Sequence, residues 1–197
     1  VRQWDVLGHS WGGGIAMLAA ARDLVATRRL VTVDAVGPTS AWMTPLHEAV
    51  LSRVTPEERA VLHDTHHALA SPDAAVHAAH SRAGYRGWFA DLAFASYFTP
   101  PEAGSETGAA IAAQLRRDGY DWRESLRALS TQTLVLHGER DALPSGVALE
   151  LSALLPRAQH VLIPGAGHMP FWEAPERFFA VVESFLATPA TSPPRRA

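Results

Sequence analysis

The sequence predicts an α/β protein with a partial parallel β-sheet and a long helical insertion between its two halves. Apolar strands alternate with helix-like stretches in residues 1–38 and again in 129–187, which is typical of parallel sheets. The region between them, 39–128, carries helix-start signals and no convincing strand. With 197 residues, 47% of them hydrophobic, the chain is long enough for one packed core and a lid.

The first half of the predicted sheet begins with an apolar run. Residues 1–7 have the length and apolar character of a short buried strand, and a helix is expected from Trp11 to about Thr27. The stretch "RLVTVDAVGP" (29–38) then predicts a second strand, which Gly37 and Pro38 close. Strand, helix and strand in this order form the unit from which parallel sheets are built.

The middle of the chain is expected to form a helical cap. Thr55-Pro56-Glu57-Glu58 places an N-cap residue, a proline and a glutamate in the order that begins a helix. Ser71-Pro72-Asp73 repeats this start, and "TGAAIAAQLRRDG" ends on Gly119, a residue suited to close a helix. Aromatic residues are frequent here, and some of them should line a pocket.

The second half of the sheet returns to the alternating pattern. "QTLVLHGERDALP" (132–144) and "AQHVLIPGAGHMP" (158–170) each predict a strand followed by a loop, with a helix over 144–155 between them. A last amphipathic helix is expected over 174–186. The remaining residues, 188–197, have the composition of a disordered tail.

Composition excludes several function classes. The net charge is −3, so the chain offers no basic field for nucleic acid. It contains no cysteine and no lysine, which excludes thiol nucleophiles, Schiff-base lysines and phosphate-loop lysines. No apolar run approaches the roughly 20 residues of a membrane span, and no signal peptide is visible. We therefore expect a cytoplasmic protein that acts away from membranes.

The bend after the first strand carries the first chemical signal. Gly8-His9-Ser10-Trp11-Gly12 fits the pattern G-x-S-x-G, in which a serine projects from a sharp strand-to-helix turn and the glycines avoid collisions across it. The helix that begins at Trp11 directs backbone N–H groups toward the site, so the Trp11 N–H is the expected donor to an oxyanion. His9 is expected to support the turn. The motif alone also fits an idle serine in a glycine-rich turn.

Two later loops supply the groups that would activate Ser10. A serine nucleophile needs a base, and the base needs an acid that orients it. Asp141 follows the strand "TLVLHG", and His168 follows the strand "HVLIPGAG". All three residues come just after strands of one parallel sheet, where such sheets place their sites. Asp34, which follows the preceding strand, is the alternative acid, and we favour Asp141.

The segments "LGHSWGG", "TLVLHGERD" and "IPGAGHMPFWEAPERF" resemble the nucleophile, acid and histidine segments of the α/β-hydrolase superfamily. The tryptophan after the nucleophile, "FWE" after the histidine and the helical cap look most like the proline iminopeptidase branch. The resemblance implies an α/β-hydrolase fold in which residues 1–38 and 129–187 supply strands five to eight and 39–128 is the inserted cap. It also implies strands and a second oxyanion donor that would precede residue 1, so a missing N-terminal segment or chain is expected.

The expected function is hydrolysis of a small ester, amide or short peptide through an acyl-enzyme on Ser10, without metal or cofactor. Glu102 and Glu106 are candidates to hold the amino group of an N-terminal proline peptide. A lyase or a cofactor-free haloperoxidase on the same fold is the alternative. A truncated, non-catalytic remnant is a third possibility, because a chain without the first strands should fold and catalyse poorly alone.

Overall fold

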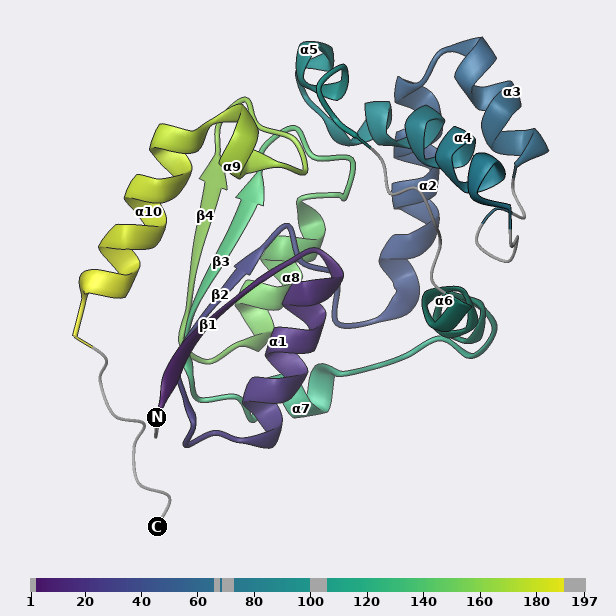
Figure 1. The fold of residues 1–197 in the computed structure, drawn as a ribbon. Helices are drawn as coiled ribbons and strands as arrows, with labels where there is room; N and C mark the ends of the chain where they lie inside the picture. Colours follow the sequence, from purple (N-terminus) through teal and green to yellow (C-terminus); the bar gives the residue numbers. More distant parts are fainter. Residues whose placement is uncertain (1–2, 66–67, 69–72, 100–105, 190–197) are drawn as a thin grey trace.

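The fold is built on a partial parallel sheet of four strands, as predicted, and the strands lie in the order β1-β2-β3-β4 (Figure 1). The computed structural model describes residues 3–65, 68, 73–99 and 106–189. Each strand pairs in parallel with the next along the chain. The four strands are β1 (Trp4–His9), β2 (Thr27–Val33), β3 (Gln132–Gly138) and β4 (Ala158–Ile163).

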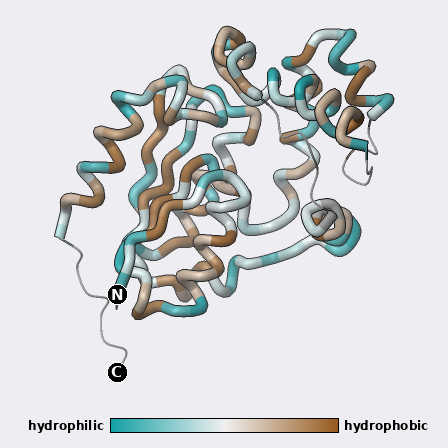
Figure 2. Tube along the Cα trace, in the orientation of Figure 1, coloured by the Kyte–Doolittle hydropathy of each residue, from teal (hydrophilic) through white to brown (hydrophobic). Residues whose placement is uncertain are grey.

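Helices cover both faces of this sheet. One face packs against α1 (Trp11–Arg22), α7 (Arg123–Arg127) and α8 (Gly146–Leu154). The other packs against α10 (Pro175–Ala187), which follows the short α9 (Pro170–Glu173). Figure 2 shows the apolar residues concentrated on the strands and on the helix faces turned toward them. The sheet is therefore the middle layer of three.

Alternation along the strands divides the core between the two faces. On β2, Leu30 packs toward α1 and α8, whereas Val31 and Val33 pack toward α10. On β3, Val135 joins the first cluster and Leu134 the second. Successive side chains of a strand point to opposite faces, so a strand that is apolar at nearly every position must be covered twice.

The segment between β2 and β3 is helical throughout its described parts. It contains η1 (Ser40–Trp42), α2 (Met43–Arg53), α3 (Pro56–Asp64), α4 (Ala74–Tyr85), η3 (Arg86–Trp88), α5 (Leu92–Ala95) and α6 (Glu106–Asp118). Of these helices, α3, α4 and α5 lie beyond the carboxyl ends of the strands, whereas α6 lies to one side of the sheet (Figure 1). An isolated bridge between Thr39 and Asp121 joins the two ends of the segment.

Local signals in the cap act as expected. Thr55 accepts a hydrogen bond from the Glu58 N–H while the Glu58 side chain accepts from the Thr55 N–H, so the capping box is complete. Gly119 ends α6 with a φ of 67°. The start of α4 differs from the expectation: the Asp73 side chain caps it, and Ser71 and Pro72 lie outside the described residues. These helix boundaries are set by residues within one turn of the boundary.

Several predicted boundaries are wrong. The first strand, expected over 1–7, spans Trp4–His9, and the second, expected over 29–38, spans Thr27–Val33 and ends before Gly37 and Pro38. The helix expected to run to about Thr27 ends at Arg22, because the Asp23 side chain accepts hydrogen bonds from the N–H groups of Val25 and Ala26. An aspartate that satisfies nearby backbone groups in this way favours a turn over a continued helix. Thr27 instead begins β2.

The division of the chain into cap and core stays a prediction, and α7 bears on it. Although α7 lies within the expected cap range 39–128, Leu126 is fully buried in the cluster formed with α1 and α8. Residues 190–197, most of the expected tail, lie outside the described residues.

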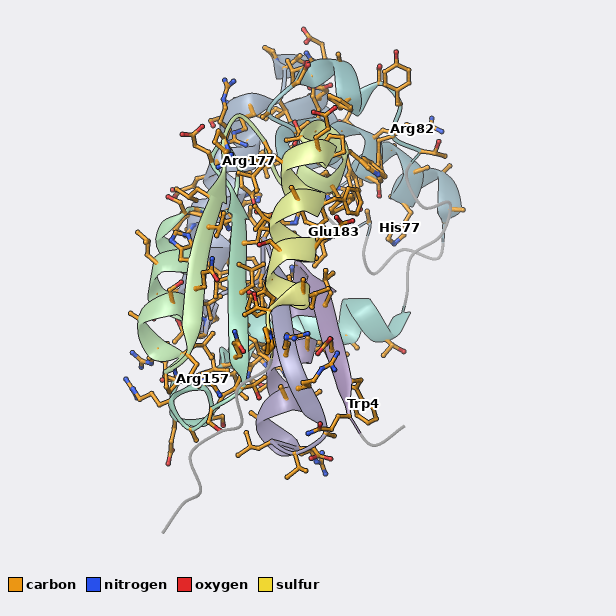
Figure 3. The ribbon with its side chains drawn as sticks, turned by 90° about the vertical axis from the view of Figure 1, so that its left-hand side faces the viewer. Trp4, His77, Arg82, Arg157, Arg177 and Glu183 are labelled. Atoms are coloured by element: carbon orange, nitrogen blue, oxygen red, sulfur yellow. The ribbon has the colours of Figure 1, made fainter. Side chains whose placement is uncertain are left out.

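The outer edge of the sheet is apolar and open at β1. Trp4 and Leu7 are 49% and 50% exposed, and Ile15 on the adjacent α1 is 68% exposed. Figure 3 shows Trp4 extending away from the sheet at the start of β1. The neighbouring β2, paired on both sides, has only one exposed residue. No helix in the described part of the chain is long and apolar enough to cross a membrane.

Candidate active site

Ser10 lies in a strained turn between β1 and α1. Its φ is 54°, in the left-handed region that side chains other than glycine rarely adopt. Its N–H donates to the Val33 carbonyl of β2, and its own carbonyl accepts from the Gly13 N–H. The neighbouring strand and the new helix thus fix a serine that projects at the carboxyl end of the sheet, as the motif predicts.

Gly8 permits this sharp turn. A Cβ at position 8 would lie 2.2 Å from the Gly12 carbonyl oxygen, because the start of α1 passes directly over the end of β1. Gly12 itself has open space where a Cβ would be. The first glycine of the motif is therefore required by packing, whereas the second leaves the approach to Ser10 uncovered.

Asp141 and His168 form a buried hydrogen-bonded pair. His168 Nδ1 lies 2.8 Å from Asp141 Oδ2, and both residues are at most 8% exposed. Burial opposes ionisation of Asp141, but His168 and the Leu143 N–H outweigh it and hold the pKa of Asp141 below its ordinary value. An ionised Asp141 fixes the proton of His168 on Nδ1 and leaves Nε2 available as a base.

Asp34 lies next to this pair and differs from it in charge. Burial, followed by the negative charge of Asp141, raises the pKa of Asp34 well above its ordinary value. Asp34 Oδ1 accepts the Gly138 N–H at 2.7 Å, whereas Asp34 Oδ2 is buried with no hydrogen-bond partner among the described residues. The φ of Asp34 is 44°, so this residue also lies in a strained turn after its strand.

His137 is the fourth polar residue of the cluster and is also neutral. Burial lowers its pKa, and its Nε2 donates to the Leu143 carbonyl at 2.9 Å. The cluster therefore carries its negative charge on Asp141, the carboxylate that contacts His168. Of the two aspartates considered from sequence, the geometry favours Asp141 as the orienting acid.

Three side chains of this site lie close enough together to be considered as metal ligands. Oxygen and nitrogen atoms of Asp34, Asp141 and His168 lie within 4.8 Å of one another, the one such group in the described part of the chain. Asp141 Oδ2 is bonded to His168 Nδ1 and Asp34 Oδ1 to the Gly138 N–H, whereas Asp34 Oδ2 has no hydrogen-bond partner among the described residues.

The structure brings the loops of Ser10 and His168 together through His9. His9 Nε2 donates to the His168 carbonyl at 2.8 Å, and the two imidazole rings are 4.7 Å apart. Among the described residues, no hydrogen bond joins Ser10 Oγ to His168. The complete Ser10–His168–Asp141 row stays a prediction, and catalytic contacts of this kind often tighten only when substrate binds.

Trp11 begins α1, so its N–H is among the first four of the helix and has no partner within it. Its indole ring lies 5.4 Å from that of Trp42 and 6.3 Å from Tyr120. Trp42 Nε1 donates to the Tyr120 hydroxyl, which donates to the Gly37 carbonyl. The residue after Ser10 therefore joins an aromatic cluster at the base of the cap.

An open cavity of about 450 Å³ lies between the cap and α9. Aromatic rings line it: Phe94, Tyr97, Phe171 and Trp172. The Phe171 ring meets His9 edge-on at 5.2 Å, so this cavity adjoins the His9–His168 contact. Glu102 lies outside the described residues, as does the side chain of Glu106, the other residue expected to hold an amino group.

Sequence reasoning missed three residues that surround the Asp141–His168 pair. The Trp88 ring lies tilted against that of His168, Arg53 donates to the Asp141 carbonyl, and Glu173 accepts from the Gly167 N–H. Of these, Glu173 alone had a signal, because it is the acidic residue of "FWE" shortly after His168.

His9 should make folding stability depend on pH. Burial, then the neighbouring His168, lowers the pKa of His9 to about 4, below the value near 6.5 of an unfolded chain. The unfolded state therefore binds the proton first, and stability is lost as pH falls from 6.5 to 4. By pH 5 the loss is about 2 kcal/mol. In urea unfolding, the difference in the free energy of unfolding between pH 7 and pH 5 should be smaller for His9→Gln than for wild type. The amide of this variant can still donate to the His168 carbonyl.

The exposed His47 provides the control. His47→Gln should keep the full difference between pH 7 and pH 5. An equal pH dependence for wild type and His9→Gln would show that His9 does not titrate as described.

Comparison with known proteins places this chain in one family. A model of the alpha/beta hydrolase family matches residues 3–181. Two 2-hydroxymuconate semialdehyde hydrolases are similar in sequence, from Pseudomonas putida (31% identical) and Pseudomonas sp. strain CF600 (30% identical). Each match covers 95% of this chain and 63% of the relative, so the chain spans less than two thirds of their length.

Solved structures share the fold at lower identity. A proline iminopeptidase from Mycobacterium smegmatis has a TM-score of 0.61 at 20% identity, over 94% of this chain and 65% of that one. A meta-cleavage product hydrolase from Pseudomonas fluorescens IP01 gives the same TM-score, identity and coverage. The parallel sheet, the strained serine turn and the family match agree, and this chain belongs to the alpha/beta hydrolase family.

Proposed function

We propose that the chain carries the catalytic residues of a serine hydrolase that acts on a small carbonyl substrate. The observation that carries this proposal is the buried 2.8 Å bond between His168 Nδ1 and Asp141 Oδ2, whose histidine loop His9 joins to the strained turn of Ser10. Such a pair serves to make a histidine basic on its other nitrogen. The turn that holds Ser10 exposes a hydroxyl for that base to act on.

In the proposed reaction, Ser10 Oγ attacks the carbonyl carbon as His168 Nε2 accepts its proton. The oxyanion that forms is stabilised by the Trp11 N–H at the start of α1. His168 returns the proton to the leaving group, and Asp141 stabilises the imidazolium meanwhile. Water then attacks the acyl-enzyme, the same steps run in reverse, and the acyl group is released. The reaction therefore needs only side chains, backbone and water.

The aromatic cavity supports a substrate with an apolar part. Phe94, Tyr97, Phe171 and Trp172 offer mostly apolar surface beside the His9–His168 contact. Small esters, amides and N-terminal proline peptides are one class to test. The 30–31% identity to 2-hydroxymuconate semialdehyde hydrolases, over 95% of this chain, favours their named substrate as a second class.

Reaction with a fluorophosphonate tests the nucleophile. Wild-type protein should be labelled on Ser10, and Ser10→Ala should not be labelled, because only an activated serine hydroxyl attacks the phosphorus quickly. Mass spectrometry of the labelled peptide identifies the site. A 4-nitrophenyl ester, a proline arylamide and 2-hydroxymuconate semialdehyde then rank the substrate classes.

Each alternative function has its own outcome in this experiment. Labelling without accumulation of an acyl-enzyme from the nitrophenyl ester would favour the lyase or haloperoxidase alternative. Failure of folded wild-type protein to react at all would favour a non-catalytic remnant and contradict the proposal.

The two aspartates of the site should differ sharply in their effect on turnover. Asp141→Asn removes the acceptor that fixes the His168 tautomer and should reduce kcat by about 10⁴-fold. Asp34→Asn keeps a donor toward Asp141 and should change kcat by no more than about tenfold. Steady-state kinetics on the preferred substrate measures both, and the reverse order would make Asp34 the orienting acid.

We also propose that another strand pairs with the open edge of β1 in the working enzyme. The apolar Trp4, Leu7 and Ile15 are about half exposed or more, and the curated relatives are longer than this chain. An uncovered apolar edge offers unpaired backbone groups to any other strand.

Residues 1–197 alone should therefore self-associate as concentration rises. Leu7→Lys should weaken this association in sedimentation velocity, because a charge on an edge strand opposes pairing. Val25→Lys is the control, since Val25 is 75% exposed but lies outside the strands. A monomer that unfolds cooperatively and turns over substrate fully would contradict the proposal.

A further inference from the structure

A short segment of the cap, residues 87–91, lies against both loops of the Asp141–His168 pair, and we call it the strap. It spans the end of η3 and the turn before α5. The His168 N–H donates to the Trp88 carbonyl at 2.9 Å, and the Trp88 ring lies 4.4 Å from the imidazole of His168. The strap thus contacts His168 through both its backbone and a side chain.

Glu173 binds the strap to the loop that carries His168. Its Oε1 accepts the N–H groups of Ala90 at 2.7 Å and Asp91 at 3.0 Å. Its Oε2 accepts the Gly167 N–H at 2.7 Å. One carboxylate therefore connects two backbone segments about 80 residues apart through three charge-assisted hydrogen bonds, which are stronger than neutral ones.

Arg53 binds the strap to the loop that carries Asp141. From the end of α2, its Nη1 donates to the Gly87 carbonyl at 3.2 Å and its Nη2 to the Asp141 carbonyl at 2.8 Å. Arg53 thus holds the first residue of the strap, and Glu173 holds the last two. Each connects the strap to a different member of the Asp141–His168 pair.

Steric contacts show independently how closely the strap packs on the histidine loop. A Cβ at Gly167 would lie 2.6 Å from both the Ala90 nitrogen and the Trp88 oxygen, and 2.9 Å from Glu173 Oε2. A Cβ at Gly87 would similarly lie 2.9 Å from Val50 Cγ1 on α2. Gly167 thus allows the histidine loop to pack closely on the strap, and Gly87 allows the strap to pack closely on α2.

We infer that Glu173 and Arg53 are positioning residues, which hold the strap against the acid and histidine loops and thereby fix the geometry of the Asp141–His168 pair. This inference rests on the proposed function, because it assigns a catalytic purpose to that pair. The cap then does more than cover the substrate. It supplies the support for the imidazole, and displacement of a reacting group by 1 Å can cost about 10²-fold in rate.

Glu173→Gln is the most selective test. The carbonyl oxygen of the new side-chain amide would still accept from Ala90 and Asp91, but its NH₂ group would face the Gly167 N–H as a second donor. The histidine loop should therefore be released while the cap stays attached. We expect kcat to fall by about 10- to 100-fold with a smaller change in KM, and Arg53→Gln to act in the same direction from the acid loop.

Proton NMR reads the pair itself without any substrate. The His168 Nδ1 proton, held by Asp141, should give a far-downfield resonance in wild-type protein that broadens or disappears in Glu173→Gln and Arg53→Gln. Glu176→Gln and Arg177→Gln are matched controls, because both residues are exposed on α10 just after Glu173. Both controls should keep the resonance and the wild-type kcat.

Three results would overturn the inference. One is a lower Tm for Glu173→Gln with an unchanged downfield proton and kcat, which would make Glu173 a purely structural residue. Another is equal loss in the two control variants. The third needs no variant: amide exchange of Gly167 and His168 in wild-type protein as fast as in exposed loops would show that the strap does not hold them.

These readouts separate the inference from the proposed function. If fluorophosphonate fails to label Ser10 but the downfield resonance still depends on Glu173 and Arg53, the hydrolase proposal fails and the inference about the strap stands. If Ser10 is labelled but the downfield resonance does not depend on Glu173 or Arg53, the inference about the strap fails and the hydrolase proposal stands.

Discussion

The site depends on keeping one negative charge inside the protein, on Asp141. A buried carboxylate is costly unless hydrogen bonds and an opposing group compensate it. Here His168 and the Leu143 N–H provide that compensation, and the negative charge of Asp141 helps to raise the pKa of the neighbouring Asp34. Ionising Asp34 as well would place two like charges side by side out of water. The protonation of one aspartate and the ionisation of the other are therefore parts of one arrangement.

The parallel sheet explains why these residues meet at all. Strands that run in the same direction deliver the loops that follow them to one edge, so residues far apart in sequence become neighbours there. Ser10 and Asp34 follow the paired strands β1 and β2, and both have positive φ. They are the two residues other than glycine with this conformation in the described part of the chain. Backbone strain is thus concentrated where polar side chains must be aimed at one point.

Much of this arrangement could be predicted from the sequence because its signals are local. The turn of Ser10, the four strands and the loops of Asp141 and His168 each follow from a few adjacent residues. The helix that was expected to continue to Thr27 shows the limit, since Asp23 decides between two local patterns of similar strength. The protonation of Asp34 depends on burial and on Asp141, a neighbour from a distant part of the chain, for which the sequence has no local sign.

The role of Arg53 could not be predicted for the same reason. It joins backbone groups from distant parts of the chain, and an arginine at the end of an amphipathic helix normally signals only an exposed face. The contact between Ser10 Oγ and His168 could not be predicted for a different reason. Both residues were identified from sequence, but the last contact depends on side-chain orientation that spacing does not encode.

The two glycine-lined contacts of the strap have a consequence for how this protein could be diversified. A cap that only covers the substrate could be replaced by an unrelated cap without disturbing the catalytic residues. In this protein, replacing the whole cap would also remove the strap, which supports the imidazole of His168. Chimaeras with foreign insertions should therefore be cut inside the insert so that residues 87–91 and Arg53 are retained, and loop libraries should vary α3, α4 and α6 while leaving that junction intact.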